Sequence, residues 1–204
     1  MSFPITHLVF SEGIFKNSGL AGNTAERDFF LGVSFPDIRY LGVIERSVTH
    51  TKNNGQSAFL QGMNAHLEMD IFRFEFLAKI LPEVQDPIKD MTIKLLEDLL
   101  FYEKSTNWQK YQTFFDEVIE DELALVDDVA AIQHWHMMMR DYLAKQPDFL
   151  TLKDLANRMN INPKLFRRVK TELLVMQDDD RIKDAILQMY QEGSHSGYCI
   201  SFES

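Results

Sequence analysis

His66 and Asp70 lie four residues apart in a segment with helical periodicity, and their types and spacing are suited to metal chemistry. Side chains at positions i and i+4 of a helix lie one above the other, so both can reach a common point. An imidazole together with a carboxylate suits zinc or a similar divalent ion. Gly62, one turn earlier on nearly the same side, leaves room for a ligand or for another backbone.

The periodicity predicts a helix over residues 56–80 that directs Asp70 into its apolar side. Burying a lone carboxylate is costly, so Asp70 there needs a metal, another cation or several hydrogen-bond donors. The alternative to a metal is a His–Asp pair tied to a buried arginine, for which Arg73 and Arg39 are available. The predicted buried residues are Phe59, Leu60, Met63, Leu67, Ile71, Phe74 and Leu77, and the predicted solvent-facing ones are Ser57, Gln61, Asn64, Glu68, Glu75 and Lys79.

Three further potential ligands, His7, Asp37 and His50, precede this helix, and each has an ordinary interpretation when taken alone. His7 stands among apolar residues, as a core histidine would. Asp37 follows a proline, as turn formers do, and His50 could simply be exposed. Combined with the His–Asp pair of the helix, they form an ordered series of nitrogen and oxygen donors.

This series resembles the zinc-dependent phospholipase C and nuclease family, whose ligands come in the order His, Asp, His and then His-x-x-x-Asp on one helix. The stretch Phe-Phe-Leu-Gly-Val-Ser-Phe-Pro-Asp-Ile, residues 29–38, looks like the family's approach to its aspartate ligand, and residues 62–70 match its Gly-x-x-x-His-x-x-x-Asp helix. The resemblance covers about residues 3–80. It implies an all-α metallohydrolase with one or two zinc ions and the ligands His7, Asp37, His50, His66 and Asp70.

If a metal is bound, Asp37 is the natural bridging ligand or catalytic base, because a carboxylate can span two ions or accept a proton from water. Arg39, two residues later, could bind a substrate phosphate through the fork of its guanidinium group. The alternative for Arg39 is an ion pair with Asp37 or Glu45. The expected substrate is a small phosphorylated molecule or a phospholipid headgroup.

The family's later histidine ligands have no counterpart at the matching positions of this chain. The nearest substitutes are His134 and His136, which are two residues apart and therefore face different sides of a helix. We expect His134 to face inward, because Met138 and Asp141 share its side. His134 is therefore a potential additional ligand or substrate contact.

Residues 151–172 contain a second pattern, with the rhythm of a helix-turn-helix and six basic against two acidic residues. Lys164, Arg167 and Arg168 lie on its second helix, where a DNA-binding protein would carry its recognition residues. The alternative is a packing corner formed by Leu165, Phe166 and Val169, with the basic side against the acidic body. This part of the chain therefore offers a DNA-binding regulator as a second functional hypothesis.

Charge and composition limit the class of protein. The chain has 204 residues, 45% hydrophobic and 25% charged, with a formal net charge of −10. Residues 151–204 contain eight basic and eight acidic residues, so the negative charge belongs to residues 1–150, and nucleic-acid binding by that part is unfavourable.

A single cysteine excludes a disulfide scaffold, and no apolar run approaches the ~20 residues of a membrane span. The start of the chain shows no secretory signal, so we expect a cytoplasmic protein.

The predicted organisation is an all-α multi-helix bundle with a small helical C-terminal appendage. We expect a metallohydrolase-like domain over residues 1–146, the helix-turn-helix-like appendage over 147–192 and a tail over 193–204. A zinc-dependent phosphoesterase is the favoured function, and a catalytically degenerate interaction module of the same fold is a further alternative. The predicted helices span residues 5–15, 23–33, 56–80, 87–104, 108–125, 127–145, 151–159, 163–176 and 179–191, with a loop over 36–55.

Overall fold

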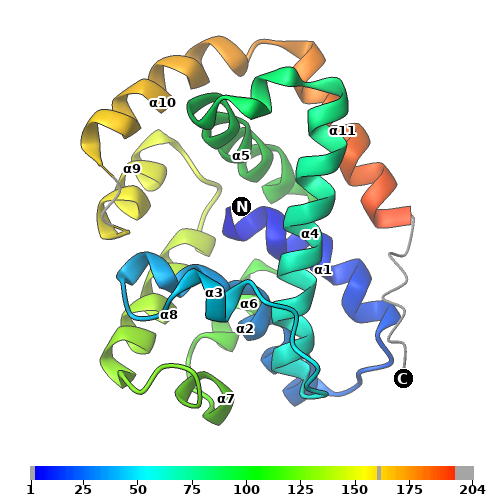
Figure 1. Cartoon of the computed structure of the whole chain (residues 1–204), viewed down its shortest axis with the longest axis vertical. Helices are drawn as coiled ribbons and strands as arrows, with labels where there is room; N and C mark the ends of the chain where they lie inside the picture. Colours follow the sequence, from blue (N-terminus) through cyan, green and yellow to red (C-terminus); the bar gives the residue numbers. More distant parts are fainter. Residues whose placement is uncertain (1–2, 160–161, 196–204) are drawn as a thin grey trace.

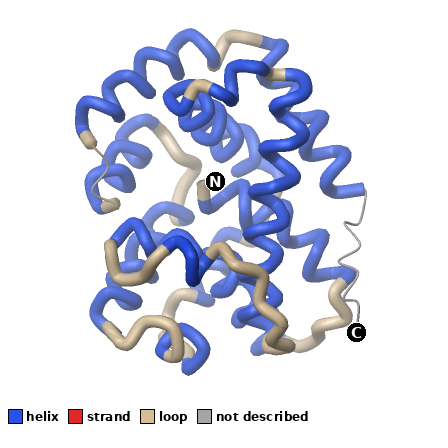
Figure 2. The backbone as a smooth tube through the Cα atoms, viewed as in Figure 1, coloured by secondary structure: helices blue, strands red, loops and turns tan. Residues whose placement is uncertain are grey.

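The computed structural model describes residues 3–159 and 162–195, and every regular element within these ranges is a helix (Figures 1 and 2). The predicted all-α class is therefore confirmed. In chain order the elements are α1 (Pro4–Asn17), α2 (Asn23–Ser34), the 3-10 helix η1 (Phe35–Leu41), α3 (Arg46–Thr49), α4 (Ala58–Ile80), η2 (Pro82–Gln85), α5 (Pro87–Phe101), η3 (Tyr102–Lys104), α6 (Trp108–Phe114), α7 (Glu120–Leu123), α8 (Val129–Leu143), α9 (Phe149–Arg158), α10 (Pro163–Met176) and α11 (Asp180–His195).

Helices α2 and α4 pack against each other at very short range, because glycines lie at their crossing. A Cβ atom on Gly62 would lie 2.0 Å from the carbonyl oxygen of Phe29, and one on Gly32 would lie 1.9 Å from that of Phe59. Both positions must therefore lack a side chain for the two backbones to touch. Of the two uses predicted for Gly62, the structure shows the approach of another backbone.

The start of α1 is held by a buried carboxylate from α5. Asp98 accepts hydrogen bonds from the backbone N–H groups of Ile5 (3.3 Å) and Thr6 (2.7 Å) and from the Thr6 hydroxyl (2.7 Å). The first N–H groups of a helix have no partner within the helix, so a carboxylate there stabilises it. The Tyr142 hydroxyl of α8 donates to the same carboxylate at 2.8 Å. Asp98 thus ties together three helices next to His7.

The buried side of α4 is rotated from the one predicted. Ile71 and Phe74, which we expected in the core, are 50% and 51% exposed, so that prediction is wrong. Asn64, expected to face solvent, is buried, and so is Arg73. The rotation has a physical cause, because both polar side chains find partners in other elements. The buried residues of α4 are Phe59, Gly62, Met63, Asn64, Ala65, His66, Met69, Asp70, Arg73 and Leu77.

Two predicted segments differ from the structure in the middle of the chain. The expected loop over residues 36–55 contains most of η1 and the short helix α3. The helix expected over 108–125 is instead two short helices, α6 and α7, separated by residues 115–119. Both segments lie in the part of the chain that surrounds α4 and α8, and η1 contacts α8.

Helix ends also differ from the predictions. Gly22 occupies the N-cap position of α2, and no side chain caps this helix. Helix α11 continues to His195, so residues 193–195 are helical and not part of a tail as predicted, and residues 196–204 lie outside the described residues.

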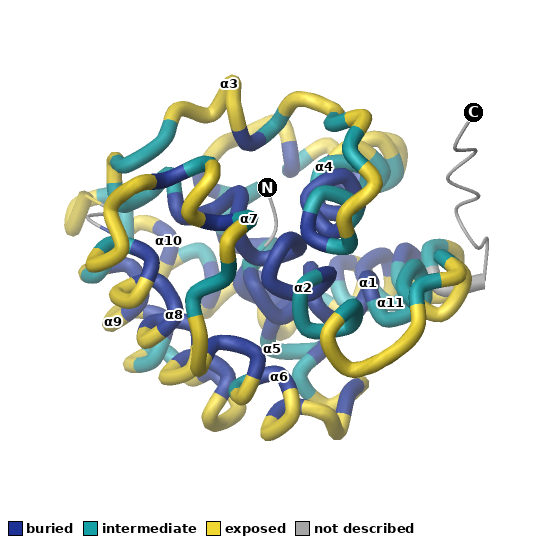
Figure 3. Tube along the Cα trace, turned by 90° about the horizontal axis from the view of Figure 1, so that it is seen from below, coloured by how far each residue is buried: buried dark blue, intermediate teal, exposed yellow. Residues whose placement is uncertain are grey.

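Helices α9 to α11 cover one end of the molecule (Figure 1). Helix α10 packs against α5, α11 packs against α4, and α9 bridges α8 and α10. Figure 3 shows buried stretches of the central helices meeting in the interior, whereas α3 and its flanking segments lie at the surface. None of the described helices is long and apolar enough to cross a lipid bilayer.

Candidate metal centre

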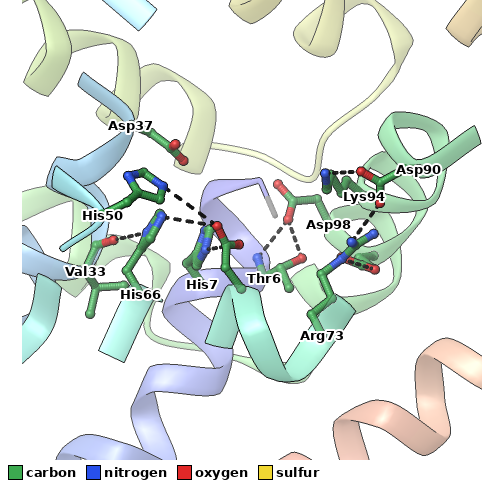
Figure 4. Close-up of polar contacts among 12 residues, drawn as sticks. Thr6, His7, Val33, Asp37, His50, His66, Arg73, Asp90, Lys94 and Asp98 are labelled. Atoms are coloured by element: carbon green, nitrogen blue, oxygen red, sulfur yellow. Dashed lines mark hydrogen bonds and ion pairs between the residues drawn. The ribbon is translucent and has the colours of Figure 1, made fainter. Parts of the chain in front are cut away.

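The five predicted ligands meet at one place, and Figure 4 labels four of them, His7, Asp37, His50 and His66. Helix α1 carries the first histidine, η1 the first aspartate, and α4 the His–Asp pair, while the remaining histidine directly follows α3. Their ligand atoms form two overlapping groups, in each of which all atoms lie within 4.8 Å of one another. The groups are His7, Asp37 and His66, and His50, His66 and Asp70.

Asp70 is the carboxylate around which the three imidazoles gather. Its Oδ1 lies 3.3 Å from Nε2 of His7, and its Oδ2 lies 3.8 Å from Nε2 of His66 and 3.9 Å from Nε2 of His50. The rings of His7 and His66 are stacked, with centroids 3.8 Å apart and planes 12° from parallel. The spacing of four residues therefore brings the pair of α4 to one point, as the sequence predicted.

Hydrogen bonds outside the cluster orient two histidines, and one of them also sets the tautomer of His66. Nδ1 of His66 lies 2.9 Å from the carbonyl oxygen of Val33, which can only accept, so Nδ1 carries the proton and Nε2 keeps its lone pair. The Thr49 hydroxyl donates to the carbonyl oxygen of Arg46 and lies 2.9 Å from Nδ1 of His50. This contact engages Nδ1 of His50 outside the cluster, so Nε2 is the ring nitrogen that faces the other ligands. Metal-binding histidines are typically oriented by such outer hydrogen bonds.

Burial keeps the histidines neutral near pH 7. Desolvation lowers the pKa of His66 to about 4, with a further lowering by the charge of His7. Desolvation likewise lowers the pKa of His50 to about 3 and lowers that of His7, although the hydrogen bond to Asp70 opposes the shift for His7. A neutral imidazole is the form that binds metals.

The two carboxylates differ in their electrostatic surroundings. Desolvation raises the pKa of Asp37. For Asp70, desolvation acts in the same direction but is outweighed by the hydrogen bond from His7 and the charges of the histidines, which lower its pKa well below the usual value. Asp70 is therefore ionised at neutral pH, whereas Asp37 has the greater tendency to take up a proton.

Three polar atoms of the cluster are buried without a hydrogen bond to any part of the chain that the structure describes. They are Oδ1 of Asp37, Nε2 of His50 and Nε2 of His66. An unsatisfied buried polar atom costs roughly 1–3 kcal/mol, so three at one point need a compensating ligand. Nitrogen and oxygen donors of this kind fit zinc or a similar divalent ion.

The predicted alternative, a His–Asp pair tied to arginine, is not what the structure shows for Arg73. Its Nε donates to both carboxylate oxygens of Glu97, at 2.7 and 2.8 Å, and its Nη1 donates to Asp90 at 2.8 Å. Lys94 pairs with the other oxygen of Asp90. Arg73 thus belongs to a separate ionic cluster, one turn along α4 from Asp70.

Arg39 lies at the edge of the metal centre, beside Asp37. Its Nη2 is 3.6 Å from Oδ1 of Asp37, so one of the two ion pairs weighed for Arg39 is present. The same nitrogen donates to the Tyr40 hydroxyl at 3.1 Å, and the guanidinium carbon lies 4.3 Å from the centre of the Tyr40 ring. These contacts hold a delocalised cation next to the ligands.

His134 is not brought to the cluster, and the prediction that it faces inward is wrong. Its side chain is exposed on α8, whereas His136 is buried. Nε2 of His136 lies 2.8 Å from Oε1 of Glu122, whose other oxygen accepts the backbone N–H of Ile119. Glu122 satisfies the imidazole, so the inward position of His136 has a structural explanation.

The predicted nucleic-acid residues lie far along the chain, on α10. Lys164, Arg167 and Arg168 are exposed there, while Val169 is buried. The packing-corner alternative is therefore right about Val169 and about Leu165 and Phe166, which pack against the core, whereas the three basic side chains are exposed and not covered by the body of the molecule.

Sequence reasoning missed the residues that orient the ligands. Val33 and Thr49 bind the outer nitrogens of two histidines, and Asp98 holds the start of α1. Asn64 fixes the segment after His50, because its side-chain amide exchanges two hydrogen bonds of 2.8 Å with the backbone of Asn53. Of these residues only Asp98 could have been suspected from the sequence, because Glu97 and Asp98 are adjacent acidic residues within an apolar helical pattern.

Comparison of the chain with protein-family models, with curated proteins and with solved structures finds no match.

Proposed function

We propose that this protein is a metal-dependent hydrolase of phosphate esters whose centre binds zinc. The observation that carries the proposal is the convergence of Nε2 of His50 and Nε2 of His66 on the Asp70 carboxylate, with neither nitrogen hydrogen-bonded to any described residue. Two more donors complete the set, and Arg73 is engaged by Glu97 and Asp90 instead. The residues that would hold the ion are His7, Asp37, His50, His66 and Asp70.

The geometry favours one ion over two. Both potential ligand groups include His66, whose Nδ1 is already engaged by the carbonyl oxygen of Val33. A single remaining nitrogen serves one ion at a time, so the two groups are alternatives or parts of one site. Nε2 of His7 lies 3.3 Å from Oδ1 of Asp70, so binding of the ion by this nitrogen would replace that contact.

The chemistry of the site follows from the surrounding side chains. A bound divalent ion supplies Lewis-acid chemistry, which acidifies water and polarises a phosphoryl oxygen. Asp37, with its raised pKa and an oxygen free of hydrogen bonds, accepts a proton from the attacking water. Arg39 binds a non-bridging phosphate oxygen and exchanges part of its contact with Asp37 for the substrate. A small phosphate ester or a phospholipid headgroup carries the negative charge that Arg39 and a bound divalent ion would attract.

Zinc content tests the binding site. After gentle purification we expect about one equivalent of zinc in the wild type and in H134A, because His134 is exposed outside the cluster. H66A removes the nitrogen common to both ligand groups and should lower zinc affinity by at least about 100-fold. Less than about 0.3 equivalents in the wild type, or equal zinc in H66A, would reject the metal centre.

Turnover separates the enzyme from a degenerate interaction module of the same fold. At saturating zinc, bis(4-nitrophenyl) phosphate is the probe, and D37N should reduce kcat by about 100-fold or more because asparagine cannot accept the proton. H134A serves as the matched control and should keep wild-type kcat. A protein that binds zinc but shows no turnover, or equal turnover in D37N, would contradict the proposed reaction while leaving the metal site intact.

A further inference from the structure

Helix α10 has two different faces. Its inner face packs on α5 through Val169, Leu173 and Met176, which are buried. Its outer side chains, at spacings of three and four residues, lie within one arc of the helix and are exposed. We define the α10 outer face by these residues: Lys164, Arg167, Arg168, Thr171, Leu174 and Val175.

The first half of the α10 outer face is cationic. Lys164, Arg167 and Arg168 make no ion pair with any described residue, whereas Arg158 and Arg181 each pair with two carboxylates. Arg168 interacts electrostatically with Asp86, but the Asp86 carboxylate already caps α5. This cationic surface is an exception on a chain with a formal net charge of −10.

The second half of the same face is apolar. Val175 is 68% exposed and Leu174 is 58% exposed. Together with Leu150 of the neighbouring helix α9, at 70%, they are the three most exposed large hydrophobic side chains among the described residues. Leu174 and Val175 are adjacent in the chain and share the outer face with the cations, which points to a partner that covers both kinds of surface.

We propose that the α10 outer face docks onto a membrane surface that contains anionic phospholipids. Basic residues attract anionic headgroups, and apolar residues on the same helix insert into the boundary with the acyl chains. A DNA duplex would use the cations but would leave Leu174 and Val175 in water. The combination therefore favours a lipid surface over nucleic acid, although both carry phosphates. The inference rests on α10 alone and is independent of the metal centre.

Vesicle co-sedimentation tests the proposal with the full chain. The probes are vesicles of phosphatidylcholine with phosphatidylserine, vesicles of phosphatidylcholine alone, and a DNA duplex. We expect binding to the phosphatidylserine vesicles that weakens as salt is raised. R167A/R168A should weaken it roughly 30-fold, and L174S/V175S about tenfold.

Matched control variants change the same types of residue elsewhere on the surface. K79A/K104A removes two exposed cations, and I71S/F74S removes two half-exposed apolar side chains of α4. Both should bind vesicles like the wild type, and thermal melting should show all four variants folded. The changed residues are exposed, so folding should persist.

Three outcomes would overturn the proposal. The first is no binding of the wild type to phosphatidylserine vesicles. The second is equal weakening by the control variants, which would show that α10 has no particular role. The third is tight binding to the DNA duplex that R167A/R168A abolishes and L174S/V175S does not, with no vesicle binding. That result would assign the face to nucleic acid.

Discussion

Helix α4 contributes to two buried polar clusters that lie one turn apart and differ in charge balance. In the Arg73 cluster, two cations, Arg73 and Lys94, face two carboxylates, Glu97 and Asp90. Apart from Nη2 of Arg73, the buried polar atoms of this cluster have partners in the described chain. The fold itself therefore explains this cluster.

In the metal centre, the described cations do not match the carboxylates in the way that they do in the Arg73 cluster. Its histidines are neutral near pH 7 because burial lowers their pKa values, so they add no full positive charge beside its carboxylates, and Arg39 lies at the edge, 3.6 Å from Asp37. Two imidazole nitrogens and one carboxylate oxygen have no hydrogen bond to the part of the chain that the structure describes. A cluster whose donors all point at one place and stay unsatisfied indicates a ligand, whereas a balanced one indicates structure.

The largest effect that distinguishes the clusters is expected at Arg73. Replacing Arg73 by Met leaves Glu97 buried without its cation, and the free energy of unfolding should fall by about 3–5 kcal/mol in urea titrations. Added zinc should not restore the lost stability through this cluster, because none of the proposed metal ligands belongs to it. In R73M/E97M, where both charges are removed, much of the stability should return. A loss below about 1 kcal/mol in R73M would show that the cluster is not a structural ion pair.

Acidification should weaken the metal-free protein through His66. The unfolded chain takes up this proton near pH 6.5, while in the folded protein burial delays protonation to about pH 4. The unfolded state therefore binds more protons between these values, and the free energy of unfolding falls as the pH is lowered through them. Over the whole window His66 contributes roughly 3 kcal/mol.

A comparison of variants isolates this contribution, because Asp98 acts in the opposite sense. Burial raises the pKa of Asp98 to about 7, so its protonation stabilises the folded state as the pH falls from 7 towards 4. H66Q keeps a donor for the Val33 carbonyl and removes only the titrating ring. The wild type should lose more stability than H66Q between pH 6.5 and 4. Parallel curves, with H134Q as the exposed control, would contradict the assigned protonation state.

Local spacing predicted more of this site than packing arguments did. The helical class and the meeting of His66 with Asp70 follow from periodicity, and the ordered series of ligands indicated that His7 and Asp37 would join them. The buried side of α4 could not be read from hydrophobicity. Arg73 turns inward because Glu97, 24 residues later, lies opposite.

The pattern along a single helix also failed to predict which of the two histidines of α8 is buried. Their neighbours along the helix favoured His134, but Glu122, 14 residues before His136, binds His136 instead. A partner brought in by tertiary packing reversed a preference based on the helix alone. Asn64 is a similar case, because its amide faces a loop backbone that no periodicity identifies.

The smallest expected effect concerns the one ligand that lies outside a helix. His50 directly follows α3, and Asn64 fixes the segment beyond it through two hydrogen bonds to Asn53. Each neutral hydrogen bond contributes about 1 kcal/mol, so N64A should lower the free energy of unfolding by about 2 kcal/mol and zinc affinity by less than tenfold. Q61A, on an exposed part of the same helix, is the control. The Arg73 cluster is built entirely on α4 and α5, so loosening this segment should leave the cost of R73M unchanged. If N64A instead abolished zinc binding, the loop, rather than the α4 pair, would be the element that forms the metal centre.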